Sequence, residues 1–394
     1  MSTKYEVGEI LDLRIEKIVP RGLGLAFAED LTVFVPLAAP GDDVRAKITQ
    51  VKRRTAFADI VEVIEKSPNR IDPPCRHFGT CGGCDFQQLD YRTQLSSKVA
   101  IIGDCIERIG KIRFEREIDI IPSPDEFGYR SRAKWHLDRE TKAIGYFKRD
   151  SHEVVDVAVC PILTPGLQSA LDLLRDKIEW DMVWNSSAEI EAASDGENIS
   201  VFSNDMAEPT IDISVQAAGE TFSFSARSFF QANHSLIDKL VETALGDSRG
   251  RTALDLYCGV GLFALPMARR FEQVIGVEGN NAAIDFAERN AKNAGLDNLR
   301  FVREGVDKFL YGHDLAGTDF VLLDPPRAGT EKFTIGNIIK LEPKEIAYVS
   351  CEPSILARDL AQLIAGGYKI DTITALDMFP QTHHVETVVR LSAN

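Results

Sequence analysis

Residues 252–278 read TALDLYCGVGLFALPMARRFEQVIGVE, and the fold class rests on this pattern. The apolar run at 252–256 predicts a buried strand, the glycine-rich turn at 257–261 follows at once, and the apolar run at 274–278 predicts the next strand. Strands that alternate with helices form a doubly wound parallel sheet, which binds ligands at the carboxyl ends of its strands. From residue 235 onward we therefore expect an α/β domain of this class.

The turn and the acidic residue after the second strand together predict a cofactor with a ribose. Glycines such as Gly259 let the backbone approach a ligand closely. Glu278 follows Asp255 by 23 residues and ends the second strand, where a carboxylate can accept both hydroxyls of a ribose. The turn lacks the G-x-G-x-x-G spacing of dinucleotide sites, which favours S-adenosylmethionine over a dinucleotide.

Two different regions precede this domain. Residues 1–65 contain about five short β-rich segments between turn signals, which predicts a small OB-like barrel of a kind that often binds oligonucleotides. A proline-rich break at 67–74 ends this region. Residues 66–225 predict a central α+β domain that includes a helix at about 90–109, and residues 226–394 form the α/β domain.

Composition restricts the class of protein. The chain has 394 residues, of which 44% are hydrophobic and 27% charged, as in ordinary globular domains. It has no apolar run near the roughly 18–20 residues that cross a bilayer, and residues 1–10 show no secretory pattern, so we expect a cytoplasmic protein without a membrane partner. The net charge of −15 argues against non-specific polyanion binding, although basic clusters such as 52–54 and 130–134 could form a local path for RNA. We expect a monomer.

Four of the seven cysteines form a candidate ligand set. Cys75, Cys81 and Cys84 lie within ten residues, and Cys160 precedes a proline much later. A reducing compartment disfavours disulfides, so this grouping predicts metal or cluster ligation. Four thiolates can hold a zinc ion or a 4Fe-4S cluster, and the spacing alone does not decide between them.

Three C-terminal segments carry candidate catalytic side chains. They read LDPPRAG at 323–329, VSCEP at 349–353 and MFPQTHHVE at 378–386. Asp324 and Cys351 each end a predicted buried strand, on the side of the sheet where active sites form. This position favours a nucleophilic role for Cys351, whereas a cysteine without such neighbours would more often be an inert core residue.

These motifs resemble those of the S-adenosylmethionine-dependent RNA uridine-5-methyltransferases, which make 5-methyluridine in ribosomal and transfer RNA. The family's D-P-P-R, S-C-x-P and terminal H-x-E segments are all matched, as is its F-Q-x-N segment, at 230–233. The resemblance covers nearly the whole chain. It implies a TRAM-like RNA-binding barrel at 1–65, a central domain with an iron–sulfur cluster at 66–225, and a methyltransferase domain at 226–394.

The resemblance also implies roles for individual residues. Cys351 would add to carbon 6 of uracil and so make carbon 5 nucleophilic toward the methyl sulfonium, and Glu386 would remove the proton from carbon 5. The target base must leave its stack to reach the pocket. Asp324 would position the base and the cofactor. Further cofactor contacts are implied for Gln231, Tyr257 and Glu278.

The four candidate ligand cysteines help to indicate which RNA is the substrate. The ribosomal branch of the family, which acts on 23S rRNA, carries this spacing together with a Cys-Pro cysteine, and the transfer RNA branch generally lacks it. The resemblance therefore implies a 4Fe-4S cluster and 23S rRNA as the substrate. The cluster ligands would be Cys75, Cys81, Cys84 and Cys160.

Three alternatives stay open. The same chemistry could act on a tRNA uridine. An amino-group methyltransferase could also use Asp-Pro-Pro, although Arg327 and Cys351 disfavour it. The third alternative is a non-catalytic RNA-binding iron–sulfur protein. The chain departs from the family pattern at Leu262 and Gly305, where the family often has asparagine on the cofactor side.

Overall fold

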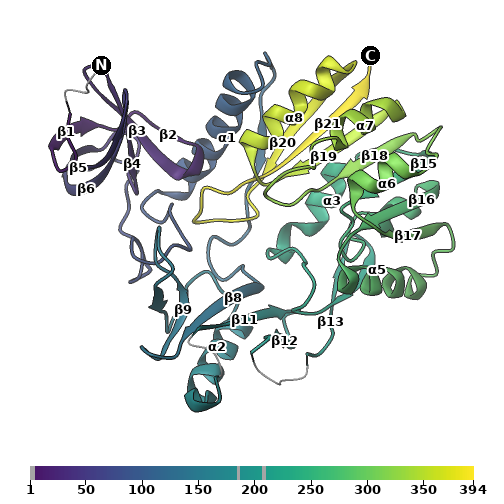
Figure 1. Cartoon of the computed structure of the whole chain (residues 1–394), viewed down its shortest axis with the longest axis horizontal. Helices are drawn as coiled ribbons and strands as arrows, with labels where there is room; N and C mark the ends of the chain where they lie inside the picture. The colour runs from purple at the N-terminus through teal and green to yellow at the C-terminus, as the bar shows by residue number, and fades with distance from the viewer. Residues whose placement is uncertain (1–4, 184–186, 206–209) are drawn as a thin grey trace.

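The computed structural model describes residues 5–183, 187–205 and 210–394. Three regions follow one another along the chain (Figure 1): a strand-rich N-terminal region, a central region and a C-terminal α/β region. Residues 1–4 begin the segment that shows no secretory pattern and lie outside the described residues. No helix in the described part of the chain combines the length and the apolar character needed to cross a membrane.

The N-terminal region is one six-stranded sheet in the order β1-β5-β6-β4-β3-β2. Alternate side chains such as Val33, Val35 and Ala46 point inward and are fully buried. The five predicted β-rich segments are confirmed, and the short β2 is an addition. The strands are β1 (Ile10–Arg14), β2 (Lys17–Val19), β3 (Leu23–Ala28), β4 (Leu31–Pro36), β5 (Asp43–Lys52) and β6 (Thr55–Glu65).

The central region contains a five-stranded antiparallel sheet in the order β10-β9-β8-β11-β12, with α2 packed against it. Its core is built around the buried Trp135 and Leu137. The predicted helix at 90–109 is α1, which begins where the Asp90 carboxylate accepts the Thr93 N–H at 2.7 Å. The elements are α1 (Tyr91–Arg108), β8 (Arg132–Asp138), β9 (Ala143–Phe147), β10 (Val154–Asp156), α2 (Pro165–Lys177), β11 (Ser187–Ser194) and β12 (Ile199–Phe202).

The C-terminal region is an eight-stranded sheet in the order β17-β16-β15-β18-β19-β21-β20-β7, which confirms the predicted doubly wound fold. All neighbours pair in parallel, except that β21 runs antiparallel to β19 and β20. The strands are β7 (Asp119–Ile121), β15 (Gly250–Leu256), β16 (Phe271–Glu278), β17 (Leu299–Arg303), β18 (Phe320–Leu323), β19 (Glu345–Ser350), β20 (Tyr368–Leu376) and β21 (Glu386–Ala393). A separate hairpin joins β13 (Ile213–Ala217) and β14 (Glu220–Phe224).

Helices cover both faces of this sheet. Alternate strand residues point to opposite sides, so that Leu322 joins one apolar core and Leu323 the other. The first core contains residues of α3, α4 and α5, and the second contains residues of α6, α7, α8 and α1. The helices are α3 (Ile237–Leu245), α4 (Ala264–Ala268), α5 (Asn281–Asn293), α6 (Val306–Gly312), α7 (Thr334–Leu341) and α8 (Pro353–Ala365).

Two elements of the central stretch belong in space to the C-terminal sheet. Helix α1 lies alongside α8 (Figure 1) and buries Ile101, Ile102 and Ile106 in the second core. Strand β7 forms the edge of the sheet next to β20. Both elements lie within residues 66–225, and the division into three domains at 65 and 225 stays a prediction.

Candidate active site and cysteine cavity

The turn after β15 and the end of β16 meet at one edge of the sheet. Tyr257 has φ 66° and Gly259 has φ 54°, and this left-handed conformation is uncommon for a side chain as large as tyrosine. The two carboxylate oxygens of Glu278 accept the N–H of Gly259 at 3.2 Å and the N–H of Asn280 at 2.7 Å. The structure thus brings the predicted turn and the predicted acidic residue together.

Several buried side-chain oxygens have no hydrogen-bond partner among the described residues. They include both carboxylate oxygens of Asp255, in β15, and the amide oxygen of Gln231. Burial raises the pKa of Asp255 well above its usual value, and the charges of Asp324 and Glu278 add to this effect. A buried polar group without a partner costs about 1–3 kcal/mol, so such atoms mark places where a polar ligand fits. Sequence reasoning missed Asp255, although its place just before the glycine turn is a usable signal.

The Cys351 thiol lies among two carboxyl groups and one guanidinium. Burial raises the pKa of Cys351 to about 12, Glu386 and Asp324 raise it further, and Arg327 acts in the opposite direction. Burial raises the pKa of Asp324 to about 7. Burial and the charge of Asp324 hold the pKa of Glu386 well above its usual value. The three predicted catalytic residues are therefore close enough to influence one another electrostatically.

Arg327 lies in the candidate site, although the sequence analysis assigned it no role there. It follows Asp324 by three residues and supplies the positive charge that favours both the Cys351 thiolate and the Glu386 carboxylate. One oxygen of Glu386 is buried and has no hydrogen-bond partner within the described residues. This oxygen is available to a bound substrate.

The two histidines before Glu386 differ in their surroundings. Burial, together with the nearby His383 and Arg327, lowers the pKa of His384 to about 2, so that its ring is neutral at pH 7. The His383 N–H donates to Asp85 Oδ1 at 2.8 Å, and its ring pairs with Asp85 Oδ2. His383 is therefore held by Asp85, whereas His384 is buried and neutral.

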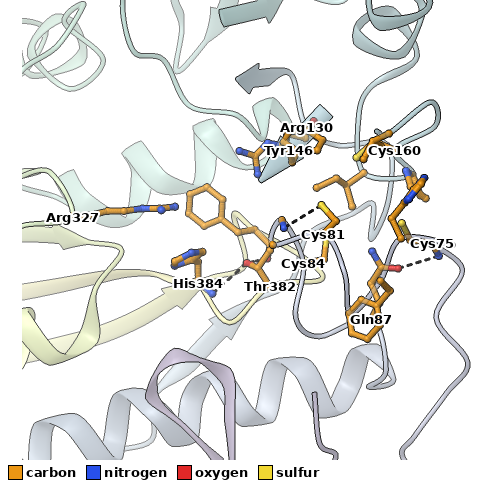
Figure 2. Close-up of a pocket in the computed structure, with 18 residues that line it drawn as sticks. Cys75, Cys81, Cys84, Gln87, Arg130, Tyr146, Cys160, Arg327, Thr382 and His384 are labelled. Atoms are coloured by element: carbon orange, nitrogen blue, oxygen red, sulfur yellow. Dashed lines mark hydrogen bonds between the residues drawn. The ribbon is translucent and has the colours of Figure 1, made fainter. Parts of the chain in front are cut away.

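The four candidate ligand cysteines line one cavity of about 200 Å³ (Figure 2). Burial raises the pKa of Cys84 to about 12, and the Cys160 and Cys81 thiols raise it further because like charges would face one another. Arg149 opposes this effect at Cys81, and Arg130 does so at Cys160. Within the described ranges, no group of three or more His, Cys, Asp or Glu is arranged to hold a single metal ion. The iron–sulfur cluster stays a prediction.

The cavity also reaches the active site. Arg327, Phe379 and His384 line it together with the cysteines, and Figure 2 shows Arg327 and His384 at the side opposite Cys75. The cysteine cavity and the surroundings of Cys351 thus share the Arg327 side chain.

The two departures from the family pattern have different surroundings. Leu262 is 7% exposed and packs in the apolar core that contains α4. Gly305 precedes α6 and leaves this helix without a side-chain cap. Neither residue therefore supplies the polar side chain that asparagine would provide.

Two family models match the chain. One, described as tRNA (Uracil-5-)-methyltransferase, matches residues 163–394, and the TRAM domain model matches residues 4–61. The chain belongs to the tRNA (uracil-5-)-methyltransferase family. It is therefore an S-adenosylmethionine-dependent RNA uracil-5-methyltransferase with a TRAM domain, as the sequence predicted. The non-catalytic alternative and the amino-group methyltransferase are not retained.

Relatives of this uracil-5-methyltransferase match it over almost their whole length. The 23S rRNA (uracil(1939)-C(5))-methyltransferase RlmD of Pectobacterium atrosepticum is 32% identical over 96% of this chain and 92% of its own. An uncharacterized RNA methyltransferase of Thermosynechococcus vestitus is 31% identical over 99% of both chains. The crystal structure of the Pyrococcus abyssi tRNA (uracil-54, C5)-methyltransferase with S-adenosyl-L-homocysteine has a TM-score of 0.75 and 26% identity, and covers 97% of this chain and 100% of that one.

Proposed function

We propose that this enzyme methylates carbon 5 of a specific uridine in 23S rRNA, with Cys351 as the covalent nucleophile and Glu386 as the general base. The observation that carries this mechanism is the grouping of the Glu386 and Asp324 carboxyl groups and a guanidinium, that of Arg327, around the Cys351 thiol. The thiol and Asp324 follow neighbouring parallel strands, at the edge where α/β sheets hold their active sites.

The first half of the reaction makes carbon 5 nucleophilic. The Cys351 thiol passes its proton to solvent as its sulfur bonds to carbon 6 of uracil, and the electron pair of the carbon 5–carbon 6 double bond moves into an enolate. Bound S-adenosylmethionine would supply an electrophilic methyl group to carbon 5, with the electron pair of the broken carbon–sulfur bond left on S-adenosylhomocysteine. Arg327 favours the thiolate at the start of this sequence, because its positive charge lowers the pKa of the thiol.

The second half of the reaction restores the aromatic base. Carbon 5 now carries a methyl group and a proton, and Glu386 takes this proton. The electron pair of the broken carbon–hydrogen bond re-forms the ring double bond, and the bond between carbon 6 and sulfur breaks as its electrons return to Cys351. Burial and Asp324 strengthen Glu386 as a base by raising its pKa, and its unpaired oxygen is free to accept the proton.

The cofactor would lie at the carboxyl end of β15. Glu278 would bind the ribose hydroxyls, because a carboxylate accepts both. Tyr257 and Gly259, both with left-handed backbone, would line the cofactor, and Asp324 would position cofactor and base. Gln231 offers a buried oxygen without a partner among the described residues, as a polar cofactor contact requires.

Two findings favour 23S rRNA over transfer RNA. Several relatives at about 32% identity over nearly the full length are named as 23S rRNA enzymes, whereas the tRNA enzyme of known structure is 26% identical. The second finding is the complete set of four cysteines, which the ribosomal branch of the family carries. The closest competing proposal is the same chemistry on a tRNA uridine.

A direct assay separates these substrates. Labelled S-adenosylmethionine is offered with unmodified 23S rRNA and, side by side, with unmodified tRNA. We expect label in 23S rRNA, recovered as 5-methyluridine. Label in tRNA alone would keep the chemistry and overturn the choice of substrate, and label in neither would contradict the proposed function.

We also propose that Cys75, Cys81, Cys84 and Cys160 hold a 4Fe-4S cluster. Their shared cavity and the nearby Arg130 and Arg149 support this, because two cations offset the charge of four thiolates. The methyl transfer requires no electrons, so the cluster would order the chain or the RNA.

Metal analysis tests the cluster. Protein purified without oxygen should be brown and contain about four iron atoms per chain, because each cubane holds four. A Cys84→Ser variant should lose most of this iron, while Cys105→Ser, which changes a buried thiol on α1, should retain it. Colourless protein with one zinc per chain would contradict the proposal.

A further inference from the structure

The loop that leads to Glu386 is held by the residues directly after Cys84. We call residues 377–385, between β20 and β21, the catalytic loop. The N–H groups of Asp85 and Phe86 donate to the Gln381 carbonyl at 3.1 and 3.0 Å. The Asp85 carboxylate then binds both the backbone N–H and the ring of His383. One short segment beside the cysteine cavity therefore fixes the middle of the catalytic loop.

Helix α1, which follows this segment, holds the catalytic loop at two further points. The Gln94 side chain exchanges two hydrogen bonds of 3.0 Å with Gln381, one to its side-chain oxygen and one from its backbone N–H. The fully buried Lys98 pairs with the fully buried Asp377 and donates to the Phe379 carbonyl at 3.0 Å. The first half of the catalytic loop is thus also tied to α1.

The backbone of the catalytic loop needs these restraints. Gln381 has φ 69°, a left-handed conformation that a residue with a side chain avoids, and it is only 1% exposed. Such a conformation persists only where the surroundings impose it. At Gln381 the imposing contacts come from Asp85, Phe86 and Gln94.

Cys351 is placed independently of these contacts. It follows β19, and α8 begins two residues later. Its neighbour Asp324 follows β18. Glu386 begins β21 directly after the catalytic loop. Disturbing the loop would therefore affect the start of β21, with Glu386, and the His384 side of the pocket, while leaving the thiol in position.

We propose that Asp85 is a positioning residue that couples the order of the cysteine-bearing segment to the general base. Asp85 directly follows Cys84, so an ordered cysteine segment fixes Asp85, and Asp85 fixes His383 and Gln381. This inference rests on the proposed roles of Cys351 and Glu386. When the contacts of Asp85 with His383 and Gln381 are lost, proton removal from carbon 5 slows more than thiol addition does. The covalent protein–RNA adduct then accumulates.

Three variants of the holoenzyme test the proposal. Asp85→Ala removes the carboxylate, Asp85→Asn keeps an oxygen that can accept the His383 N–H, and Asp90→Ala removes a nearby carboxylate that caps α1. Since small misplacements of catalytic groups can cost about a hundredfold, we expect Asp85→Ala to lower kcat at least about tenfold and to raise the adduct fraction. RNA affinity should change less than about threefold, because the Asp85 side chain contacts His383 within the chain. Asp85→Asn should restore most of the turnover, and Asp90→Ala should keep it while lowering the Tm.

Hydrogen exchange provides a readout that does not depend on activity. Amides of residues 377–385 should exchange faster in Asp85→Ala than in Asp90→Ala, with the iron content of both variants equal to that of the unmodified protein. The proposal is overturned if Asp85→Ala leaves exchange and adduct fraction unchanged, or if RNA affinity and kcat fall together. An unmodified protein that forms neither adduct nor 5-methyluridine contradicts the proposed function instead, and the exchange result still decides whether Asp85 orders the loop.

Discussion

Replacing Cys351 with alanine should lower methyl transfer by at least about 10⁴-fold, the scale expected when a covalent nucleophile is removed. Carbon 5 of uracil does not attack a methyl sulfonium without a bond at carbon 6. Cys258 is buried in the turn after β15, Cys105 is buried in α1, and the other four thiols are the proposed cluster ligands. Single-turnover transfer from labelled S-adenosylmethionine measures the loss.

The control for this prediction is Cys105→Ala, which removes a buried sulfur from α1 and should reduce stability without changing the adduct. The unmodified enzyme should give a protein–RNA adduct that survives denaturing electrophoresis, and Cys351→Ala should give none. Turnover of Cys351→Ala within tenfold of the unmodified enzyme would exclude the covalent mechanism.

Glu386→Gln should accumulate the covalent protein–RNA adduct, whereas Cys351→Ala should form none. Glutamine cannot take the proton from carbon 5, so turnover should fall by about 10²–10⁴-fold, the usual contribution of a positioned base. Thiol addition and methyl transfer precede this step, and the methylated adduct should therefore accumulate. Gel electrophoresis with labelled methyl groups detects it directly.

A nearby carboxylate serves as the matched control. Glu352 directly follows Cys351 and caps α8 by accepting the Ser354 N–H at 3.3 Å. Glu352→Gln should cost some stability and leave elimination intact. If Glu386→Gln turned over normally, the base would have to be another group, and the buried Asp324 would be the first to test.

Much of the C-terminal fold follows from local patterns. The strands at 252–256 and 320–324 are apolar runs, and their order along the chain implies a parallel sheet. The placement of α1 and β7 does not follow in this way. Apolar spacing predicts α1 as a helix, but it does not specify that the buried face meets a sheet about 150 residues or more further along the chain. Strand β7 has only three residues and carries no periodic signal.

As with the fold, only part of the candidate site could be predicted from local patterns in the sequence. Asp324 and Cys351 follow from the rule that parallel strands end at the active site. This rule does not identify Glu386, because Glu386 is the first residue of its strand and not the last. Since β21 runs antiparallel to β19, its first residue lies beside the last residues of the parallel strands. Only the family resemblance identified Glu386, and neither pattern nor resemblance revealed the contacts of Asp85.

The packing of α1 and β7 has a consequence for biosynthesis. Strand β7 pairs with β20, more than 240 residues later, so the sheet edge closes only after most of the chain has left the ribosome. A fragment that begins at residue 226 would expose the apolar surface that Ile101, Ile102 and Ile106 cover. The C-terminal region alone would therefore leave this surface uncovered, because α1 must be present for the sheet to bury its second face.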